Sequence, residues 1–237
     1  MAAFIENIEP FYGTGIKNEL GQTLEEFLEE YNPLKYKNPC STADIIVIRS
    51  QGKVESVNQG LKVLMIKRRN HPSIGRFALP GGFVEIKEDL IDAARRELTE
   101  ETGLCNIEME QMYTWGEVWR DPRTRIITTS YLAIVDDFVA QVKAGDDAAD
   151  ALWMDISLKK VESERLDFSN VERMRDMYEL VVSNQEKKLN FYSIVSVSYN
   201  ITGILKETEY EVIKNDEIAF DHPRMIVQAL LYIKENL

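Results

Sequence analysis

The segment Gly82–Leu104 constrains the fold more than any other part of the chain, because it specifies a helix and the roles of its two faces. Glu97, Glu100 and Glu101 stand three and four residues apart, so they project from one side of a helix within a single turn. The opposite side carries the apolar residues Leu90, Ile91, Ala94 and Leu98. This division predicts a helix that packs on a sheet with its apolar face and presents carboxylates on the other.

We expect this helix to cover Asp89–Thr102, because Gly103 is the residue type that most often ends a helix. Glu88 lies at its start, and Arg96 stands one turn before Glu100 and can pair with it. Just before it, Gly81 and Gly82 follow Pro80 and indicate a sharp turn.

The three carboxylates on one turn repel one another, and a hard divalent cation would remove that repulsion. Mg²⁺ prefers oxygen ligands and binds through one or two carboxylates together with substrate phosphates. Glu is also a good helix former, so the same residues could make an ordinary solvated helix face. The spacing alone leaves both interpretations open.

The rest of the chain has a mixed α/β pattern. Helices are expected at Thr23–Tyr31, at Val171–Asn184 and after Pro223, where apolar residues recur at helical spacing. Strands are expected at Asp44–Ile48, Leu61–Ile66, Ile107–Trp115, Thr124–Val135 and Leu152–Met154. Two more strands, Asn190–Tyr199 and Gly203–Val212, predict a hairpin with its turn near Asn200–Gly203.

Charge and composition exclude several classes of partner. The 237 residues include 28 Lys and Arg against 40 Asp and Glu, which gives a net charge of −12. This argues against a nucleic-acid-binding protein and against an anionic-membrane anchor. The chain has only two cysteines, Cys40 and Cys105, and its first residues lack the basic and apolar regions of a signal peptide. We therefore expect a cytoplasmic protein with no membrane partner.

One pattern in the same segment points to a known family. The pattern G-x5-E-x7-R-E-U-x-E-E-x-G-U, in which U is a bulky aliphatic residue, is matched at every fixed position. The matching residues are Gly82, Glu88, Arg96, Glu97, Leu98, Glu100, Glu101, Gly103 and Leu104. This segment resembles the Nudix box, so the chain is similar to the Nudix hydrolases. The resemblance implies an α/β/α sandwich with a mixed sheet.

Further segments resemble the branch that hydrolyses ADP-ribose and the related transcriptional regulators of NAD metabolism. They are Leu79–Glu85 (LPGGFVE), Arg120–Arg125 (RDPRTR), Ala144–Trp153 (AGDDAADALW) and Ala219–His222 (AFDH). In that branch AFDH opens the last helix of the domain, whereas here it follows Trp153 by some 60 residues. We therefore expect an N-terminal extension at 1–37, a Nudix core at 38–155, an insertion of a helix and a hairpin at 156–216, and the last helix at 217–237.

The resemblance implies Mg²⁺, or Mn²⁺ in its place, held by Glu97, Glu100, Glu101 and the backbone carbonyl of Gly81. It also implies that Glu88 and Arg96 brace and orient these carboxylates, with Gly82 and Gly103 as supporting residues. The general base stays open between a glutamate of the box and a carboxylate of the loop that holds Asp146, Asp147 and Asp150. The alternative for these aspartates is an ordinary polar turn.

The implied reaction is hydrolysis of the pyrophosphate bond in a nucleoside diphosphate linked to another group, with ADP-ribose as the expected substrate. Arg68, Phe77, Arg120 and Arg123 are the expected substrate contacts, because guanidinium groups bind phosphate oxygens and aromatic rings stack on bases. One alternative is a ligand-sensing regulator; the winged helix of the related regulators is not found in the sequence up to Leu237. Another is a clean-up enzyme for nucleoside triphosphates. Many relatives are homodimers, and we expect the same here.

Overall fold

The computed structural model describes residues 4–13, 16–136, 142, 148–168 and 171–237. The chain divides into two compact units, Met1–Asn38 and Pro39–Leu237. The first contains a short 3-10 helix η1 (Glu9–Phe11) and the helix α1 (Leu24–Glu30). Thr23 caps α1 by accepting a hydrogen bond from the Glu26 backbone, and the Glu26 side chain accepts one from the Thr23 backbone. The helix expected at Thr23–Tyr31 is confirmed.

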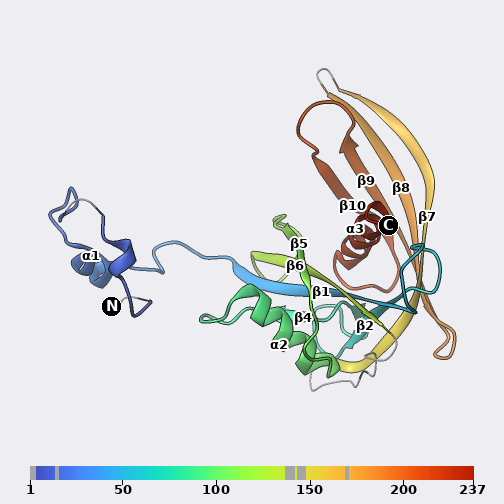
Figure 1. Ribbon diagram of the computed structural model, residues 1–237, viewed down its shortest axis with the longest axis horizontal. Helices are drawn as coiled ribbons and strands as arrows, with labels where there is room; N and C mark the ends of the chain where they lie inside the picture. Colours follow the sequence, from blue (N-terminus) through green and yellow to red (C-terminus); the bar gives the residue numbers. More distant parts are fainter. Residues whose placement is uncertain (1–3, 14–15, 137–141, 143–147, 169–170) are drawn as a thin grey trace. The chain divides into compact units, whose positions relative to one another are not determined.

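The second unit is built on one mixed sheet (Figure 1). The strands are β1 (Cys40–Ser50), β2 (Lys62–Arg68), β3 (Phe77–Ala78), β4 (Gly81–Phe83), β5 (Glu110–Trp115), β6 (Ile126–Asp136), β7 (Ala148–Phe168), β8 (Val171–Asn184), β9 (Leu189–Asn200) and β10 (Thr208–Asn215). Their order is β10-β9-β8-β7-β2-β1-β6-β5, with β3 paired to β2 and β4 paired to β1. The helices are α2 (Leu90–Thr102) and α3 (His222–Glu235).

Strand β1 lies in the middle of a sandwich, and residues 42–48 are all buried. Ala43, Ile45 and Val47 pack with Ala94 and Leu98 of α2. Their neighbours Ile46 and Ile48 belong to the cluster that contains the apolar residues of α3. Because successive side chains of a strand point to opposite faces, the two helices cover opposite sides of the sheet. The expected α/β/α sandwich is confirmed, and Figure 1 shows α2 and α3 on the two sides of β1.

Both helices follow the sequence pattern. Asp89 precedes the first residue of α2, and Gly103 ends this helix with φ 74°, a conformation that favours glycine. Pro223 stands in the first turn of α3, where its missing N–H costs nothing. None of the helices among the described residues is long and apolar enough to cross a membrane.

The helix expected at Val171–Asn184 is wrong, because this segment is the strand β8. Its buried residues Asp176, Tyr178, Leu180 and Val182 alternate with partly exposed ones, which is the period of a strand. The Met, Arg, Glu and Leu residues of the segment favour a helix, but tertiary packing overrides that preference. The described residues of 156–216, where we expected an inserted helix and hairpin, therefore contain no helix.

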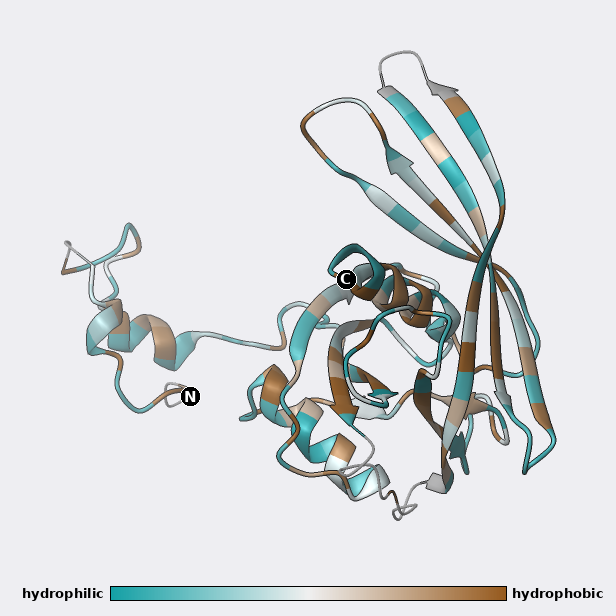
Figure 2. Ribbon diagram, turned by 45° about the vertical axis from the view of Figure 1, so that its right-hand side comes forward, coloured by the Kyte–Doolittle hydropathy of each residue, from teal (hydrophilic) through white to brown (hydrophobic). Residues whose placement is uncertain are grey.

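The strand expected at Leu152–Met154 is the start of the much longer β7, which runs past residue 156 without a break. From Asp155 onward β7 pairs with β8, and β8 pairs with β9. The expected hairpin is confirmed as the antiparallel pair β9 and β10. Strands β7 to β10 thus extend the sheet, and α3 packs against β9 and β10. Figure 2 shows these strands more hydrophobic near the rest of the sheet and more hydrophilic toward their outer ends.

Candidate active site

A cavity of about 330 Å³ opens where α2, β1, β4 and the start of α3 come together. Seven residues expected from the sequence line it: Arg68, Gly81, Gly82, Glu97, Glu101, Arg120 and Arg123. The others come from the strands and loops around it and include Asp44, Asp121, Phe220 and His222. The fold therefore gathers acidic and basic side chains from distant parts of the sequence in one cleft.

Buried carboxylates form one part of the cleft. Glu101 is only 8% exposed, and one carboxylate oxygen accepts a hydrogen bond of 2.8 Å from the Gly81 backbone N–H. Burial raises the pKa of Glu101 to about 8, and the negative charges of Glu97 and Asp44 act in the same direction. Burial also raises the pKa of Glu97, although Arg96 opposes it. A cation would be strongly favoured beside such carboxylates.

Two glycines allow the chain to approach these carboxylates closely. A β-carbon on Gly82 would lie 2.4 Å from the carboxylate carbon of Glu97. A β-carbon on Gly81 would lie 2.2 Å from the Ala43 carbonyl oxygen and 2.8 Å from a carboxylate oxygen of Asp44. Both positions therefore need glycine, and the turn after Pro80 positions the Gly81 amide on Glu101.

Arg96 holds together the carboxylates along the exposed side of α2. Its Nε and Nη2 atoms donate hydrogen bonds of 2.8 and 2.9 Å to the two oxygens of Glu88. Its Nη1 atom donates to Glu97 at 2.8 Å and to Glu100 at 3.1 Å, and Nη2 also donates to the Phe83 carbonyl. The guanidinium thus fixes the orientation of Glu97 and neutralises part of the local charge.

Two arginines with aromatic neighbours bring positive charge to the cleft. The Arg68 guanidinium lies 5.0 Å from the centre of the Phe220 ring, and its Nε donates to the Pro72 carbonyl at 2.8 Å. Arg123 lies 5.1 Å from the Phe83 ring and 6.0 Å from the Phe220 ring. These cation–π contacts help to position both guanidinium groups. The Arg123 Nε and Nη2 atoms also donate to Asp121, at 3.0 and 2.9 Å.

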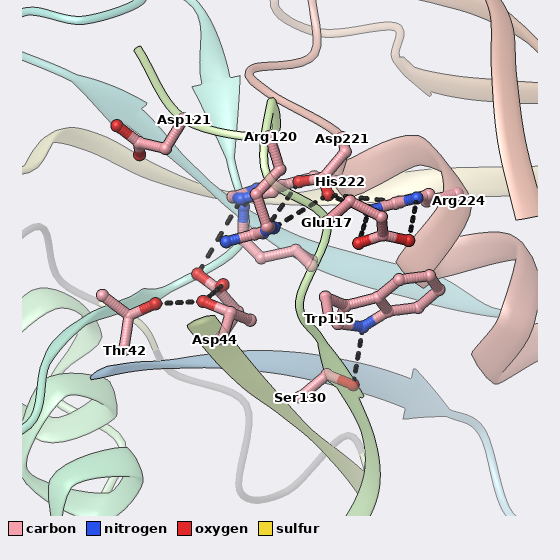
Figure 3. Close-up of polar contacts among 12 residues, drawn as sticks. Thr42, Asp44, Trp115, Glu117, Arg120, Asp121, Ser130, Asp221, His222 and Arg224 are labelled. Carbon is pink, nitrogen blue, oxygen red and sulfur yellow. Dashed lines mark hydrogen bonds and ion pairs between the residues drawn. The ribbon is translucent and has the colours of Figure 1, made fainter. Parts of the chain in front are cut away.

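Arg120 is placed differently from the sequence expectation. It lines the cleft, but its Nε and Nη2 atoms donate to Asp221 at 3.1 and 2.9 Å, and its side chain is only 6% exposed. Asp221 also accepts from Arg224, which bonds Glu117 in turn (Figure 3). The two nitrogen atoms that Arg120 would use to bind a phosphate in a bidentate manner are therefore engaged by Asp221, and this ion pair anchors the start of α3.

Sequence reasoning missed Asp44 and His222 as cleft residues (Figure 3). Asp44 accepts a hydrogen bond of 2.9 Å from Thr128. The backbone N–H of Leu79 donates to His222 Nδ1 at 2.9 Å, so the proton of neutral His222 lies on Nε2, 3.8 Å from Asp44. Asp44 is a carboxylate inside an otherwise apolar run, and this was the signal that could have identified it.

Three residues expected to act in catalysis or to bind metal or substrate, among those that the structure describes, do not line the cleft. Phe77 is buried in the core, 5.1 Å from the Phe191 ring, and does not line the cleft. The Glu100 side chain is 58% exposed and outside the cleft lining. Asp150 pairs in β7 opposite Lys67 and is also outside the lining. Asp147 and Asp146 lie outside the described residues.

In the described part of the chain, no three Asp, Glu, His or Cys side chains converge to hold a metal ion. The reason is local: Glu97 and Glu100 turn toward Arg96, while Glu101 accepts from Gly81. The donor set still fits a hard cation, because Glu97 and Glu101 are carboxylate oxygen donors that line the same cleft. Burial is the main cause of their raised pKa values, and a cation would favour their charged forms.

The family follows from the sequence model of the NUDIX domain, which matches residues 38–177. The chain belongs to the NUDIX family. The match covers β1 to β7, α2 and the first half of β8, and so contains most of the cleft.

Three similar proteins bear on the ligand. The ADP-ribose pyrophosphatase of Methanocaldococcus jannaschii is 44% identical over 96 residues, which are 40% of this chain and 56% of that protein. The ADPR responsive transcriptional repressor NtrR of Acinetobacter baylyi is 36% identical over 115 residues, 47% of this chain and 43% of that one. The NUDIX domain of Shewanella oneidensis NrtR, solved with ADP ribose, is 30% identical with a TM-score of 0.50, covering 56% of this chain and 82% of that one. The chain thus spans about half the length of the two curated relatives.

Proposed function

We propose that this NUDIX protein hydrolyses, with Mg²⁺, the pyrophosphate bond of a nucleoside diphosphate linked to another group, and that the substrate is ADP-ribose or a similar compound. The observation that carries the proposal is one cavity lined both by carboxylates, the buried Glu101 and the partly buried Glu97, and by the guanidinium groups of Arg68 and Arg123. The carboxylates suit a cation and the guanidinium groups suit phosphate oxygens. The similarity to an ADP-ribose pyrophosphatase supports the choice of substrate.

The residues that would hold Mg²⁺ are Glu97, Glu100, Glu101 and the Gly81 carbonyl, with Mn²⁺ as a substitute. When bound, the metal neutralises charge that develops on the phosphates and lowers the pKa of bound water. The Glu100 side chain would have to rotate from its exposed position toward the cleft. A change of side-chain rotamer is enough for this, because Glu100 lies one helical turn from Glu97. The Gly81 amide keeps Glu101 in place through its hydrogen bond of 2.8 Å.

Substrate binding is proposed for Arg68 and Arg123. Arg68 lies against the Phe220 ring and Arg123 against the Phe83 ring, and these contacts position both guanidinium groups at the cleft. Arg120 would act indirectly, by holding Asp221 and thus the start of α3. Glu88 and Arg96 would orient Glu97 through the hydrogen bonds described above. Gly103 supports them by ending α2.

The proton of the attacking water would pass to a carboxylate of the cleft. Glu101, Glu97 and Glu100 remain in the proposal, and Asp44 joins them because it is buried beside the same cavity. Asp150, like Glu100, does not line the cleft, and Asp147 lies outside the described residues, so both aspartates stay alternatives in the proposal. Glu101 stays in the proposal because its carboxylate lines the cleft and is held there by the Gly81 N–H.

The test is release of mononucleotide from a panel of nucleoside diphosphate derivatives and nucleoside triphosphates, with Mg²⁺ or Mn²⁺. Glu101→Gln should lower turnover by about 100-fold or more while the circular dichroism spectrum stays unchanged. Glu108→Gln is the matched control, because Glu108 is exposed and lies outside the cleft. Equal rates for the two variants would contradict the metal assignment.

A second candidate is a ligand-sensing regulator, which the similarity to a transcriptional repressor favours. It would bind ADP-ribose in the same cleft but would not need to hydrolyse it. A net charge of −12 weakens the DNA-binding part of this alternative. Tight, sequence-selective binding in a gel-shift assay at physiological salt would reverse the ranking. A clean-up enzyme is the third candidate, and preference for a triphosphate in the substrate panel would identify it.

The proposal also includes a cytoplasmic setting and a homodimer. Both cysteines, Cys40 and Cys105, are exposed and free, which suits a reducing compartment. An apolar surface formed by residues such as Ile134 and Leu237, next to the end of α3, offers a place for a second copy. Size-exclusion chromatography with light scattering tests the dimer, and a mass of 27.3 kDa would exclude it.

A further inference from the structure

A second cavity, of about 640 Å³, lies between α3 and the extension of the sheet. Strands β8, β9 and β10 supply one wall, α3 supplies another, and β5 closes a third side. Its volume is within the range of small-molecule sites. None of its lining residues lines the cleft described above.

Four tyrosines dominate this cavity: Tyr178, Tyr199, Tyr210 and Tyr232. Tyr178 and Tyr199 donate to Asp176, at 3.4 and 3.3 Å. Tyr232 donates to Glu110 at 3.0 Å, and the Tyr210 ring packs against Trp115 with centres 5.9 Å apart. The rings are therefore held in fixed orientations, so that a ligand would lose little entropy in ordering them.

The charge of the cavity is negative. Three carboxylates line it, from Glu110, Asp176 and Glu235, against the single ammonium group of Lys206. Lys160 pairs with Asp176 at 3.2 Å, and even with this lysine the carboxylates are in excess. Burial raises the pKa values of Tyr199 and Tyr210, and the hydrogen bond to Glu110 raises that of Tyr232. The charges of nearby carboxylates act in the same direction. These phenols are neutral at pH 7.

Gln228 of α3 adds an unused acceptor. Its Oε1 atom is buried and has no hydrogen-bond donor within the part of the chain that the structure describes. Gln228 also lines the cavity. A buried carbonyl oxygen without a donor is costly, and a ligand N–H group would remove that cost.

From the tyrosine rings, the excess of carboxylates and the free Gln228 carbonyl, we infer that this cavity binds a small organic cation, an amine or guanidinium compound with N–H donors. Neutral tyrosine rings attract a cation through their faces, and the attraction grows as the cation is desolvated. The carboxylates supply the opposite charge and Gln228 accepts the N–H. A nucleotide is excluded from this cavity by the same negative charge, whereas Arg68 and Arg123 make the cleft suitable for one.

Three benzyl compounds of nearly equal size and different charge test the inference: benzylammonium, benzyl alcohol and benzoate. We expect benzylammonium to shift the amide NMR signals of Gln228, Tyr232 and their neighbours in a saturable titration. Benzyl alcohol should bind at least about fivefold more weakly and benzoate more weakly still. Binding of benzoate as tightly as benzylammonium, or of none of the three, would overturn the inference. So would shifts at Gly81 and Gly82 in place of Gln228.

Two pairs of variants separate the contribution of carboxylate charge to benzylammonium binding from that of the tyrosine ring. Glu235→Gln should weaken benzylammonium binding about two- to fivefold, while Glu211→Gln, an equal charge change on the exposed side of β10, should leave it within about twofold. Tyr232→Leu should weaken binding about fivefold or more, and Tyr232→Phe, which keeps the ring, should restore it. If Tyr232→Leu does not fold, the pair Glu235→Gln and Glu211→Gln decides. Equal affinities across that pair would contradict the inference.

Discussion

Gly82 and Glu97 are in direct contact: a β-carbon on Gly82 would lie 2.4 Å from the carboxylate carbon of Glu97. The Glu97 carboxylate also accepts a hydrogen bond of 2.8 Å from Arg96. The position of this carboxylate in the cleft thus depends on a missing side chain on β4 as well as on a hydrogen bond from α2.

Gly82→Ala should therefore lower kcat/KM by about 100-fold, because a displacement of about 1 Å in an active-site group has this cost. The added β-carbon would clash with the Glu97 carboxylate and displace it. The displaced carboxylate could then not keep its present hydrogen bond with Arg96. Gly116→Ala is the matched control, since nothing lies within 4 Å of a β-carbon at Gly116. Similar kcat/KM values for the two variants would show that Glu97 has no part in the reaction.

Arg96→Gln should raise the Mg²⁺ concentration needed for half-maximal activity by about 10- to 100-fold. It removes the group that orients Glu97 and braces Glu88. Arg95→Gln removes an equal charge from the same helix, but Arg95 pairs with the exposed Asp92 and not with a carboxylate of the cleft lining in the described part of the chain. Metal titrations of activity compare the two. The account is contradicted if Arg95→Gln has the larger effect.

Arg120→Leu should lower the free energy of unfolding by about 3 kcal/mol, since it leaves the buried Asp221 with Arg224 as its remaining partner. This corresponds to a fall in Tm of about 6–12 °C. Arg123→Gln should instead raise KM about tenfold, because Arg123 is proposed to contact substrate. It also removes an ion pair with Asp121, but the backbone N–H of residue 123 still donates to Asp121, so Tm should fall less than in Arg120→Leu. Thermal unfolding and Michaelis kinetics on both variants decide. A large KM effect without loss of Tm at Arg120 would restore it as a substrate contact.

His222 should make the protein less stable in mild acid. Burial lowers the pKa of His222 more than the nearby carboxylates of Asp44 and Asp221 raise it, so the folded protein keeps the imidazole neutral. The unfolded chain takes up a proton below about pH 6.5, and the free energy of unfolding therefore falls as the pH drops from there toward the lowered folded pKa.

His222→Asn removes this titration and keeps an acceptor for the Leu79 amide. We expect its free energy of unfolding, from urea titrations between pH 7 and 5, to depend less on pH than that of the wild type, by up to about 1.4 kcal/mol per pH unit. Parallel curves for the two proteins would mean that the pKa of His222 is the same in the folded and unfolded states, which contradicts the lowered folded pKa.

The sequence predicted the helix α2 and its carboxylates well, because helical spacing and the terminating Gly103 are local signals. It also predicted the final helix and the hairpin. It failed at β8, where helix-forming residues such as Met174 and Glu179 are placed in a strand by pairing with β7 and β9. That pairing involves residues far apart along the chain, and no local pattern reports it.

The sequence predicted only the part of the candidate site that depends on local spacing. The residues of the box lie within 23 positions of one another, so their spacing places them together. Asp44 and His222 are far apart in the sequence, and only the fold brings His222 Nε2 to 3.8 Å from a carboxylate oxygen of Asp44. Phe77 was misplaced because an aromatic residue next to an arginine has the same pattern in a core strand and in a binding site.

The central claim is that the cleft catalyses metal-dependent cleavage of a pyrophosphate bond, and hydrolysis of ADP-ribose with and without a chelator tests it most directly. With Mg²⁺ the wild-type protein should release AMP and ribose 5-phosphate in equal amounts. EDTA should stop the reaction and excess Mg²⁺ should restore it. If ADP-ribose binds but is not cleaved with Mg²⁺ or Mn²⁺, or if cleavage continues unchanged in EDTA, the account is wrong.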